Sequence, residues 1–301
     1  MTGWVFGNAV LPTRVRLEGS EPPVTEPERA RVFWLLRRYT SLAYVERQRV
    51  MLGKLIEGFK AEATRASDPY TMRDYTQILG VLYRHEAAYE RGLRLLRGGN
   101  ARGYDSILEG AQVAEYFESR RFNEHDDLRW FAFGSEKERP LVGLLAWGRR
   151  SYSMARNTLR TLRAEWTYQL FQDPRSAEPA AIFPLQLEPA PDPAPRAPQC
   201  SPGDIVPVAG VWLPIGRRLG CPNYLVSQWQ FPEAMSTVAR LDDPAAEAER
   251  FPEYVYERRP SRWELCWEDQ RYAAGPIADE SEYLSADISL PSEPLLLLAS
   301  P

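Results

Sequence analysis

Proline is distributed very unevenly along this chain of 301 residues. Residues 1–173 hold 6 of the 26 prolines, and residues 174–301 hold the other 20. Because proline fixes φ and lacks an amide donor, it interrupts helices and central strands alike. Long regular elements are therefore expected only in the first part, and the second part should be loop-rich with short strands.

Charge divides the chain at the same place. Residues 1–173 carry 27 basic and 22 acidic side chains (net +5), whereas residues 174–301 carry 10 basic and 19 acidic side chains (net -9). An acidic second half argues against a direct nucleic-acid binder, which usually shows a basic face. The negative charges have two possible uses, which are binding arginines of the first half and facing a basic partner.

Apolar residues of the first half recur at three- and four-residue spacing, which is typical of helices with one buried face. Thr25 and Glu28 have the spacing of a capping box before the first stripe, which continues to Phe59. Further stripes precede Gly98-Gly99-Asn100 and follow Pro140, and short connections between them predict an antiparallel bundle. The exposed arginines of these helices are read either as a solvated face or as a patch that docks the acidic half: Arg37, Arg38, Arg47, Arg49, Arg149, Arg150, Arg156, Arg160 and Arg163.

The predicted fold class is mainly α, with a long antiparallel helical bundle and a small loop-rich C-terminal appendage that contains a few short β-strands. The predicted divisions are an extended N-terminal segment over 1–24, the bundle over 25–173, a Pro-rich linker over 174–200 and an acidic, Trp-rich appendage over 201–301. One short strand is expected over 262–268, where alternation places Trp263, Leu265 and Trp267 on one face.

Residues that would identify a reaction are missing from the sequence pattern. His85 falls on a helical stripe, and His125 lies in a loop or helix start. The spacing of Cys200, Cys221 and Cys266 matches no zinc pattern, so these are interpreted as structural thiols, with a Cys200–Cys221 disulfide left open. We therefore expect no enzyme, catalytic residue, metal or cofactor. With no signal peptide and no apolar run of roughly 18 residues, cytoplasmic residence is expected.

A distinctive pattern lies in the second half of the chain. It consists of Pro-Gly, then Pro-x-x-Gly-x-Trp-x-Pro, then Cys-Pro-Asn-Tyr, and its residues are Pro202, Gly203, Pro207, Gly210, Trp212, Pro214, Cys221, Asn223 and Tyr224. The pattern resembles the C-terminal signature of immunity proteins from bacterial polymorphic toxin systems. The nearest groups are the Imm families numbered seventy-one and seventy-two, which also have a long helical N-terminal region.

This resemblance implies a non-enzymatic inhibitor that binds one cognate protein toxin and occludes its active site. The toxin would be the C-terminal domain of an effector secreted by a type VI or contact-dependent system, with no direct contact to nucleic acid or membrane. The signature residues would then be scaffold. The alternative function is a non-enzymatic helical adaptor.

The candidate toxin-binding residues are acidic side chains with aromatic side chains among them. They are Asp242, Asp243, Glu247, Glu249, Glu253, Tyr254, Glu257, Trp263, Trp267 and Glu268. Acidic surfaces steer association with basic toxins, and aromatic anchors ringed by charge are typical of binding hot spots. The alternative interpretation is a solvated acidic loop with tryptophans in the core.

Overall fold

The computed structural model describes residues 13–16, 24–65, 69–119, 139–172, 182–215, 220–242, 253–273 and 279–284. About 52% of these residues are helical and 17% are in strands, which form two antiparallel sheets. The fold is therefore mixed α and β, and the predicted long helical bundle with a small appendage is wrong. The prediction failed because strands pair across long separations in sequence, which the local spacing of apolar residues does not reveal.

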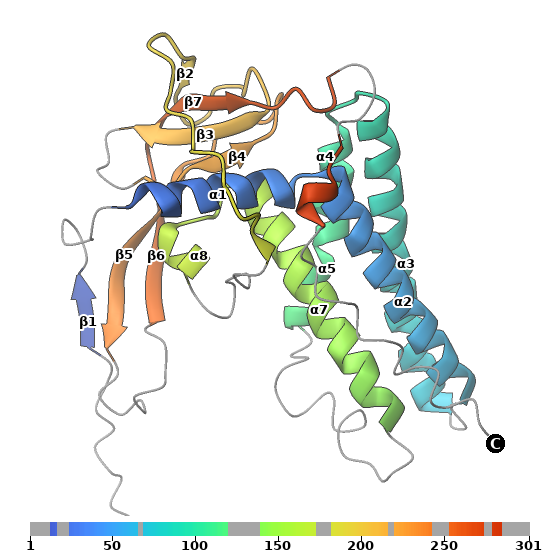
Figure 1. Ribbon diagram of the computed structural model, residues 1–301. Coiled ribbons are helices and arrows are strands. Elements are labelled where there is room, and N and C mark those ends of the chain that lie inside the picture. Colours follow the sequence, from blue (N-terminus) through green and yellow to red (C-terminus); the bar gives the residue numbers. More distant parts are fainter. Residues whose placement is uncertain are drawn as a thin grey trace, which may run out of the picture.

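Helices occupy most of the first half and strands most of the second (Figure 1). The helices are α1 (Glu26–Tyr39), α2 (Leu42–Arg65), α3 (Pro69–Arg97), α4 (Gly103–Ala111), α5 (Val113–Ser119), α7 (Arg139–Leu162) and α8 (Tyr168–Gln172). The strands are β1 (Thr13–Arg16), β2 (Gln199–Cys200), β3 (Gly210–Ile215), β4 (Asn223–Leu225), β5 (Ala234–Asp242), β6 (Glu253–Arg259) and β7 (Arg262–Glu268). A 3₁₀ turn spans Ser281–Tyr283.

The predicted helix signals lie at real helix ends. Thr25 is the N-cap of α1, and the reciprocal contacts with Glu28 complete the capping box. Helix α3 ends at Arg97, and Gly99 adopts φ +75°, the left-handed conformation that glycine favours after a helix. The first apolar stripe, however, is divided between two helices. The chain turns at Thr40 and Ser41, and α2 then runs beside α3 and α7 (Figure 1).

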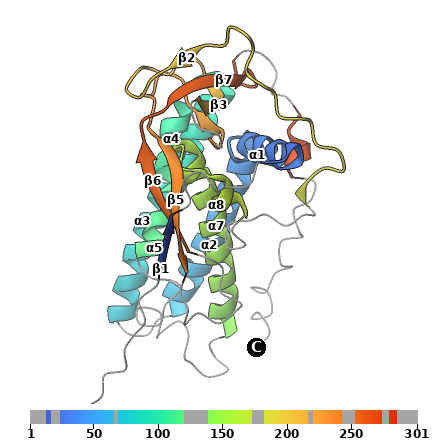
Figure 2. The same ribbon diagram turned by 90° about the vertical axis from the view of Figure 1, so that its left-hand side faces the viewer.

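The two sheets lie at the end of the molecule away from the tips of α2 and α3. One sheet has the order β2-β7-β3-β4 and packs on α1, and the other has the order β1-β5-β6. In Figure 2 the β1-β5-β6 sheet lies in front of the long helices. Strand β1 pairs with β5 from Thr13 opposite Asp242 to Arg16 opposite Ala239. Part of the predicted N-terminal extended segment therefore completes a sheet of the second half.

A bulge in β7 changes the direction of its side chains. Val211 pairs with Trp267, but the next residue, Trp212, pairs with Leu265, so Cys266 is the extra residue. Trp263 and Leu265 consequently pack with Trp212 in one cluster, whereas Trp267 packs in the larger cluster around α1. The prediction that Trp263, Leu265 and Trp267 share one face is wrong, because simple alternation holds only for an unbulged strand.

The two halves share a hydrophobic core. Its largest buried cluster combines helical residues such as Leu36, Leu52 and Leu82 with second-half residues. Val211 and Tyr224 belong to this cluster and are 1% and 0% exposed. Phe33 of α1 meets Trp267 of β7 edge to face, with ring centroids 5.8 Å apart. Burial of this interface contributes hydrophobic free energy that neither half has alone.

Gly210 allows the close approach of β3 and β7. A Cβ atom at this position would lie 2.0 Å from the carbonyl oxygen of Trp267. We expect Gly210→Ala to lower the free energy of unfolding by about 3 kcal/mol, since the strands must separate. The matched control is Gly80→Ala on α3, where a Cβ meets nothing within 4 Å. That change should raise the free energy of unfolding by about 0.5–1 kcal/mol in urea denaturation. Equal effects at the two sites would contradict the close packing at Gly210.

Candidate functional site

Acidic side chains of the second half bind arginines of α1. Arg29 lies 2.5 Å from Asp192, and Arg37 lies 2.9 Å from Glu188 and 3.7 Å from Glu282. These contacts join segments more than a hundred residues apart. Part of the negative charge is therefore used inside the molecule, which is the first of the two uses that the sequence left open.

A buried ion pair lies where α1 ends. The Arg271 guanidinium binds Asp269 at 2.7 Å, and the two side chains are only 9% and 2% exposed. Arg271 also donates to the carbonyl of Arg37 and to Oγ1 of Thr40, each at 2.9 Å. The hydroxyl of Tyr224 donates to Asp269 at 2.7 Å. The pair thus satisfies groups that the end of a helix leaves without an intrahelical partner.

The start of α2 receives its cap from the same part of the chain. The amide of Leu42 donates to the hydroxyl of Tyr272 at 2.9 Å, and the amide of Ala43 donates to the Glu280 carboxylate at 2.8 Å. Tyr272 in turn donates to Glu280. A carboxylate at a helix N-terminus is also favoured by the helix dipole. We call this group, made of Asp269, Arg271, Tyr272 and Glu280, the corner cluster.

Electrostatics keep Asp269 and Arg271 of the corner cluster in their charged forms. Burial alone raises the pKa of the Asp269 carboxyl, but the charge and hydrogen bonds of Arg271 outweigh it and hold that pKa below its ordinary value. Burial likewise opposes the charge of Arg271, but Asp269 raises its pKa well above the usual range. Burial raises the pKa of the Tyr224 hydroxyl, which stays protonated and available as a donor. The contacts of this cluster join the end of α1 to the start of α2.

The acidic cluster of 242–257 lies at β5 and β6. Asp242 is the last residue of β5 and Glu253 the first of β6, so both lie at the same end of the sheet. Tyr254 is half-buried, with its ring 6.4 Å from that of Tyr256, and Glu257 is exposed beside Arg259. The remaining predicted members, Asp243, Glu247 and Glu249, lie outside the described residues.

Of the two tryptophans in the candidate set, Trp263 is fully buried and Trp267 is half-buried. Trp263 has no exposed surface, and its indole N–H donates to the carbonyl of Pro232 at 2.8 Å. Trp267 lies between the guanidinium groups of Arg37 and Arg271, which are 5.5 and 5.4 Å from its ring. In this conformation both rings hold the core together, whereas Glu268 is exposed at the end of β7.

The first part of the signature lies in β3 of the β2-β7-β3-β4 sheet and in the loop that precedes this strand. Trp212 is fully buried and meets Phe231 edge to face at 4.9 Å. Gly203 adopts φ +90°, which favours glycine, and its amide donates to the carbonyl of Phe231 at 2.9 Å. Among the other positions, Gly210 and Pro214 are buried in β3, Pro202 is half-buried and Pro207 is exposed.

The last part of the signature joins this sheet to the helices. The Asn223 side chain accepts from the amide of Trp166 at 3.0 Å and donates to the carbonyls of Trp166 and Cys221 at 3.1 and 3.2 Å. Tyr224 reaches the corner cluster through Asp269. Cys221, like Cys200 and Cys266, is a free thiol. Burial raises the pKa of the Cys221 thiol well above its usual value and that of Cys266 to about 12, which disfavours the reactive thiolate.

Of the two histidines, the structure describes His85, whose ring contacts a backbone carbonyl. Burial lowers the pKa of His85, and its Nδ1 lies 3.0 Å from the carbonyl oxygen of Glu109. His125 lies outside the described residues. Within the part of the chain that the structure describes, no group of three or more His, Cys, Asp or Glu side chains is placed to hold a metal ion. Nor does any helix described here combine the length and apolar character needed to span a membrane.

Breaking the buried pair should be far more costly than breaking an exposed one. We expect Arg271→Met to lower the free energy of unfolding by about 3–5 kcal/mol, because it leaves the Asp269 carboxylate buried without its cation. The matched control is Arg97→Met, which removes a pair with Glu46 at 3.1 Å between side chains that are 50% and 34% exposed. The control should cost at most about 1 kcal/mol in urea denaturation. Similar losses for the two variants would contradict the corner cluster's role.

The free energy of unfolding should depend on pH through the Asp269 carboxyl. A carboxyl whose pKa is lowered by folding contributes stability that is complete above its unfolded pKa and lost as pH falls through the lower folded pKa. The difference in unfolding free energy between the parent protein and Asp269→Asn should be constant from pH 7 to about pH 5 and shrink below about pH 4. Denaturation curves at each pH measure it. A difference that grew on acidification would contradict the assigned direction.

Comparisons with known proteins identified no relative of this chain. No protein-family model, curated protein or solved structure matches the chain. The resemblance to immunity proteins therefore rests on the signature residues, whose described members form the packed joint between the sheet and the helices.

Proposed function

We propose that this protein is an immunity protein that resides in the cytoplasm, binds one cognate secreted toxin and blocks its active site. The observation that carries the proposal is the division of the acidic residues into two sets. Asp192, Glu188 and Glu282 bind α1. Asp242 and Glu253 instead lie at one end of the β1-β5-β6 sheet, and we assign them, with the acidic residues between them in the sequence, to a partner.

Electrostatic complementarity is the physical basis of this proposal. An acidic surface attracts a toxin with a basic, substrate-binding cleft and raises the rate of productive encounter. Tyr254, whose ring is half-buried, and Glu257, whose carboxylate is exposed, both belong to β6. Aromatic side chains are enriched among the residues that dominate binding energy at interfaces. Trp263, which is fully buried, belongs to the scaffold behind this surface.

Co-expression with the toxin domain encoded by the gene immediately upstream tests the proposal. We expect the protein to restore growth of cells that produce this domain, and not of cells that produce an unrelated toxin. A purified complex should form with the two proteins alone. Absence of both rescue and complex formation would contradict the immunity function and favour another class of protein.

Reversal of the charges in the acidic cluster should slow association with the toxin. Replacement of Asp242, Asp243, Glu247 and Glu249 by Lys is expected to lower the association rate about tenfold or more at low ionic strength, with a smaller difference at high salt. The matched control reverses exposed carboxylates on the helices, namely Glu26, Glu57, Glu90 and Glu109. It changes net charge equally and should leave association much faster than the cluster variant. Equal rates for the two variants in stopped-flow measurements would contradict the assigned surface.

A further inference from the structure

A small pocket lies where the end of α7 meets β4, the following loop and β6. Its volume is about 250 Å³, and its apolar wall is formed by Leu162, Val206, Leu225 and Val226. Ligand pockets usually measure about 300–1,000 Å³, so this one is suited to a single side chain. Buried apolar walls favour an apolar occupant.

The pocket is held open by a short ladder of backbone hydrogen bonds. Val206 donates to the carbonyl of Trp229 at 2.8 Å, and Gln228 donates to the carbonyl of Val206 at 2.9 Å. Gln228 adopts φ +68°, an uncommon conformation for a residue with a side chain. The indole N–H of Trp229 donates to Asp105 at 2.7 Å. A partner therefore meets a preformed pocket and does not bear the cost of ordering it.

Two arginines stand at the pocket. Arg163 and Arg258 line it, and their side chains are 30% and 37% exposed. Arg163 binds Glu115 through Nη1. Arg258 donates through Nη2 to Glu165 and to the carbonyl of Arg163, and through Nη1 to the carbonyl of Glu233, each at 3.2 Å. A guanidinium has five N–H donors, so each group has the capacity to bind a further oxygen. A carboxylate beside the apolar occupant would therefore complement the rim.

Exposed apolar surface continues from the pocket. Ile205 is 52% exposed, directly precedes Val206 and forms a β-bridge with Gln230. Gln230 itself lines the pocket and has an exposed side chain. An apolar hollow with an exposed isoleucine at its side and charged groups at its rim has the composition of a protein-binding hot spot.

We propose that this pocket receives an apolar side chain of the toxin that stands next to a carboxylate, with Arg163 and Arg258 binding that carboxylate. The inference rests on the proposed function, and it names a second contact besides the acidic cluster. Arg258 lies near the end of β6 and Glu253 at its start, which are roughly 17 Å apart at about 3.3 Å per residue. An interface of ordinary size spans this distance, so one toxin surface can reach the pocket and the acidic cluster together.

Filling the pocket from its rim tests the inference. We expect Gln230→Trp to weaken binding of the purified upstream-encoded toxin domain about 30-fold or more, as for loss of a hot spot. The matched control is Gln77→Trp, which places the same ring at an exposed position of α3 and should leave affinity unchanged.

Arg163→Gln should weaken binding about tenfold or more by removing a charged donor, with Arg97→Gln as its control. Circular dichroism and the unfolding midpoint establish that each variant is folded.

The outcomes separate the two proposals. If the parent protein binds the toxin domain and folded Gln230→Trp and Arg163→Gln bind equally well, the pocket assignment is overturned while the immunity function stands. If the parent protein does not bind, both proposals fall. Should Gln230→Trp fail to fold, hydrogen exchange of the parent protein, measured with and without the toxin domain, tests the pocket assignment. Slower exchange of the amides over 226–231 in the complex supports the pocket, and unchanged exchange there overturns it.

Discussion

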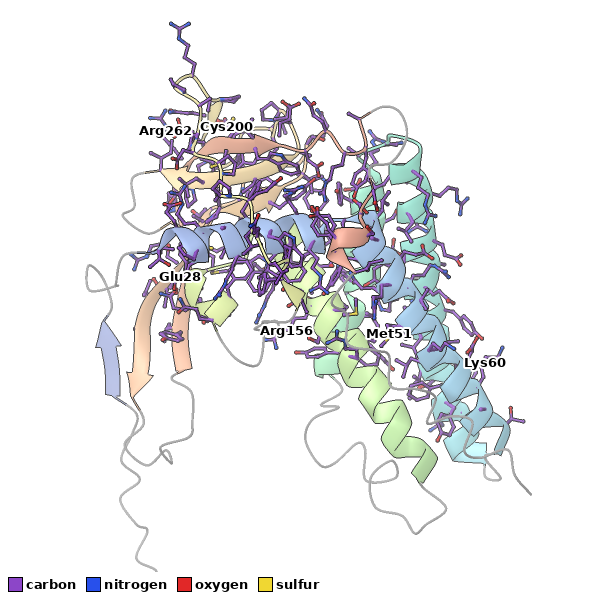
Figure 3. All side chains as sticks on the ribbon, in the orientation of Figure 1. Glu28, Met51, Lys60, Arg156, Cys200 and Arg262 are labelled. Carbon is purple, nitrogen blue, oxygen red and sulfur yellow. The ribbon has the colours of Figure 1, made fainter. Side chains whose placement is uncertain are left out.

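The ion pair between Asp269 and Arg271 stands at the point where the two halves of this protein depend on each other. Helix α1 ends and α2 begins at Thr40 and Ser41, so carbonyls of one helix and amides of the next lack intrahelical partners in one buried place. Arg271, Tyr272 and Glu280 supply those partners from more than 200 residues away. Each charge is stable there only because the others are present, since an unpaired buried charge is costly. In Figure 3, Cys200 and Arg262 lie at the end of the molecule that holds the β2-β7-β3-β4 sheet, and Met51 and Lys60 lie along α2.

This dependence determines how much of the acidic half remains for a partner. Carboxylates that lie near α1 are taken up by Arg29, Arg37 and Arg271. The tryptophans that resembled surface anchors pack against the hydrophobic clusters instead. Trp263 and Trp212 belong to one cluster, and Trp267 packs against the other. We assign to the partner the acidic cluster at β5 and β6 and the arginine-rimmed pocket beside β6. The proposed toxin contact is therefore narrower than the charge of the whole half indicates.

Local signals in the sequence predicted local structure well. The capping box at Thr25 and the stop at Gly98-Gly99 lie where helices begin and end, because both depend on residues within a few positions. Contacts across the chain were not predictable in the same way. Pairing of Thr13–Arg16 with β5 and the bulge at Cys266 depend on which strands meet, and this changed both the fold class and the face of Trp267. The ion pair of Asp269 and Arg271 was not predicted, because no local pattern shows that these two side chains are buried together.

Native-state hydrogen exchange at the start of α2 tests the central claim most directly, which is that the second half holds the α1–α2 corner as part of one cooperative unit. The account predicts that the amides of Leu42 and Ala43 exchange with the same free energy as the interior amides of Leu52 and Leu55, through global unfolding. Exchange of Leu42 and Ala43 by local opening, at a free energy clearly below that of Leu52 and Leu55, would contradict it.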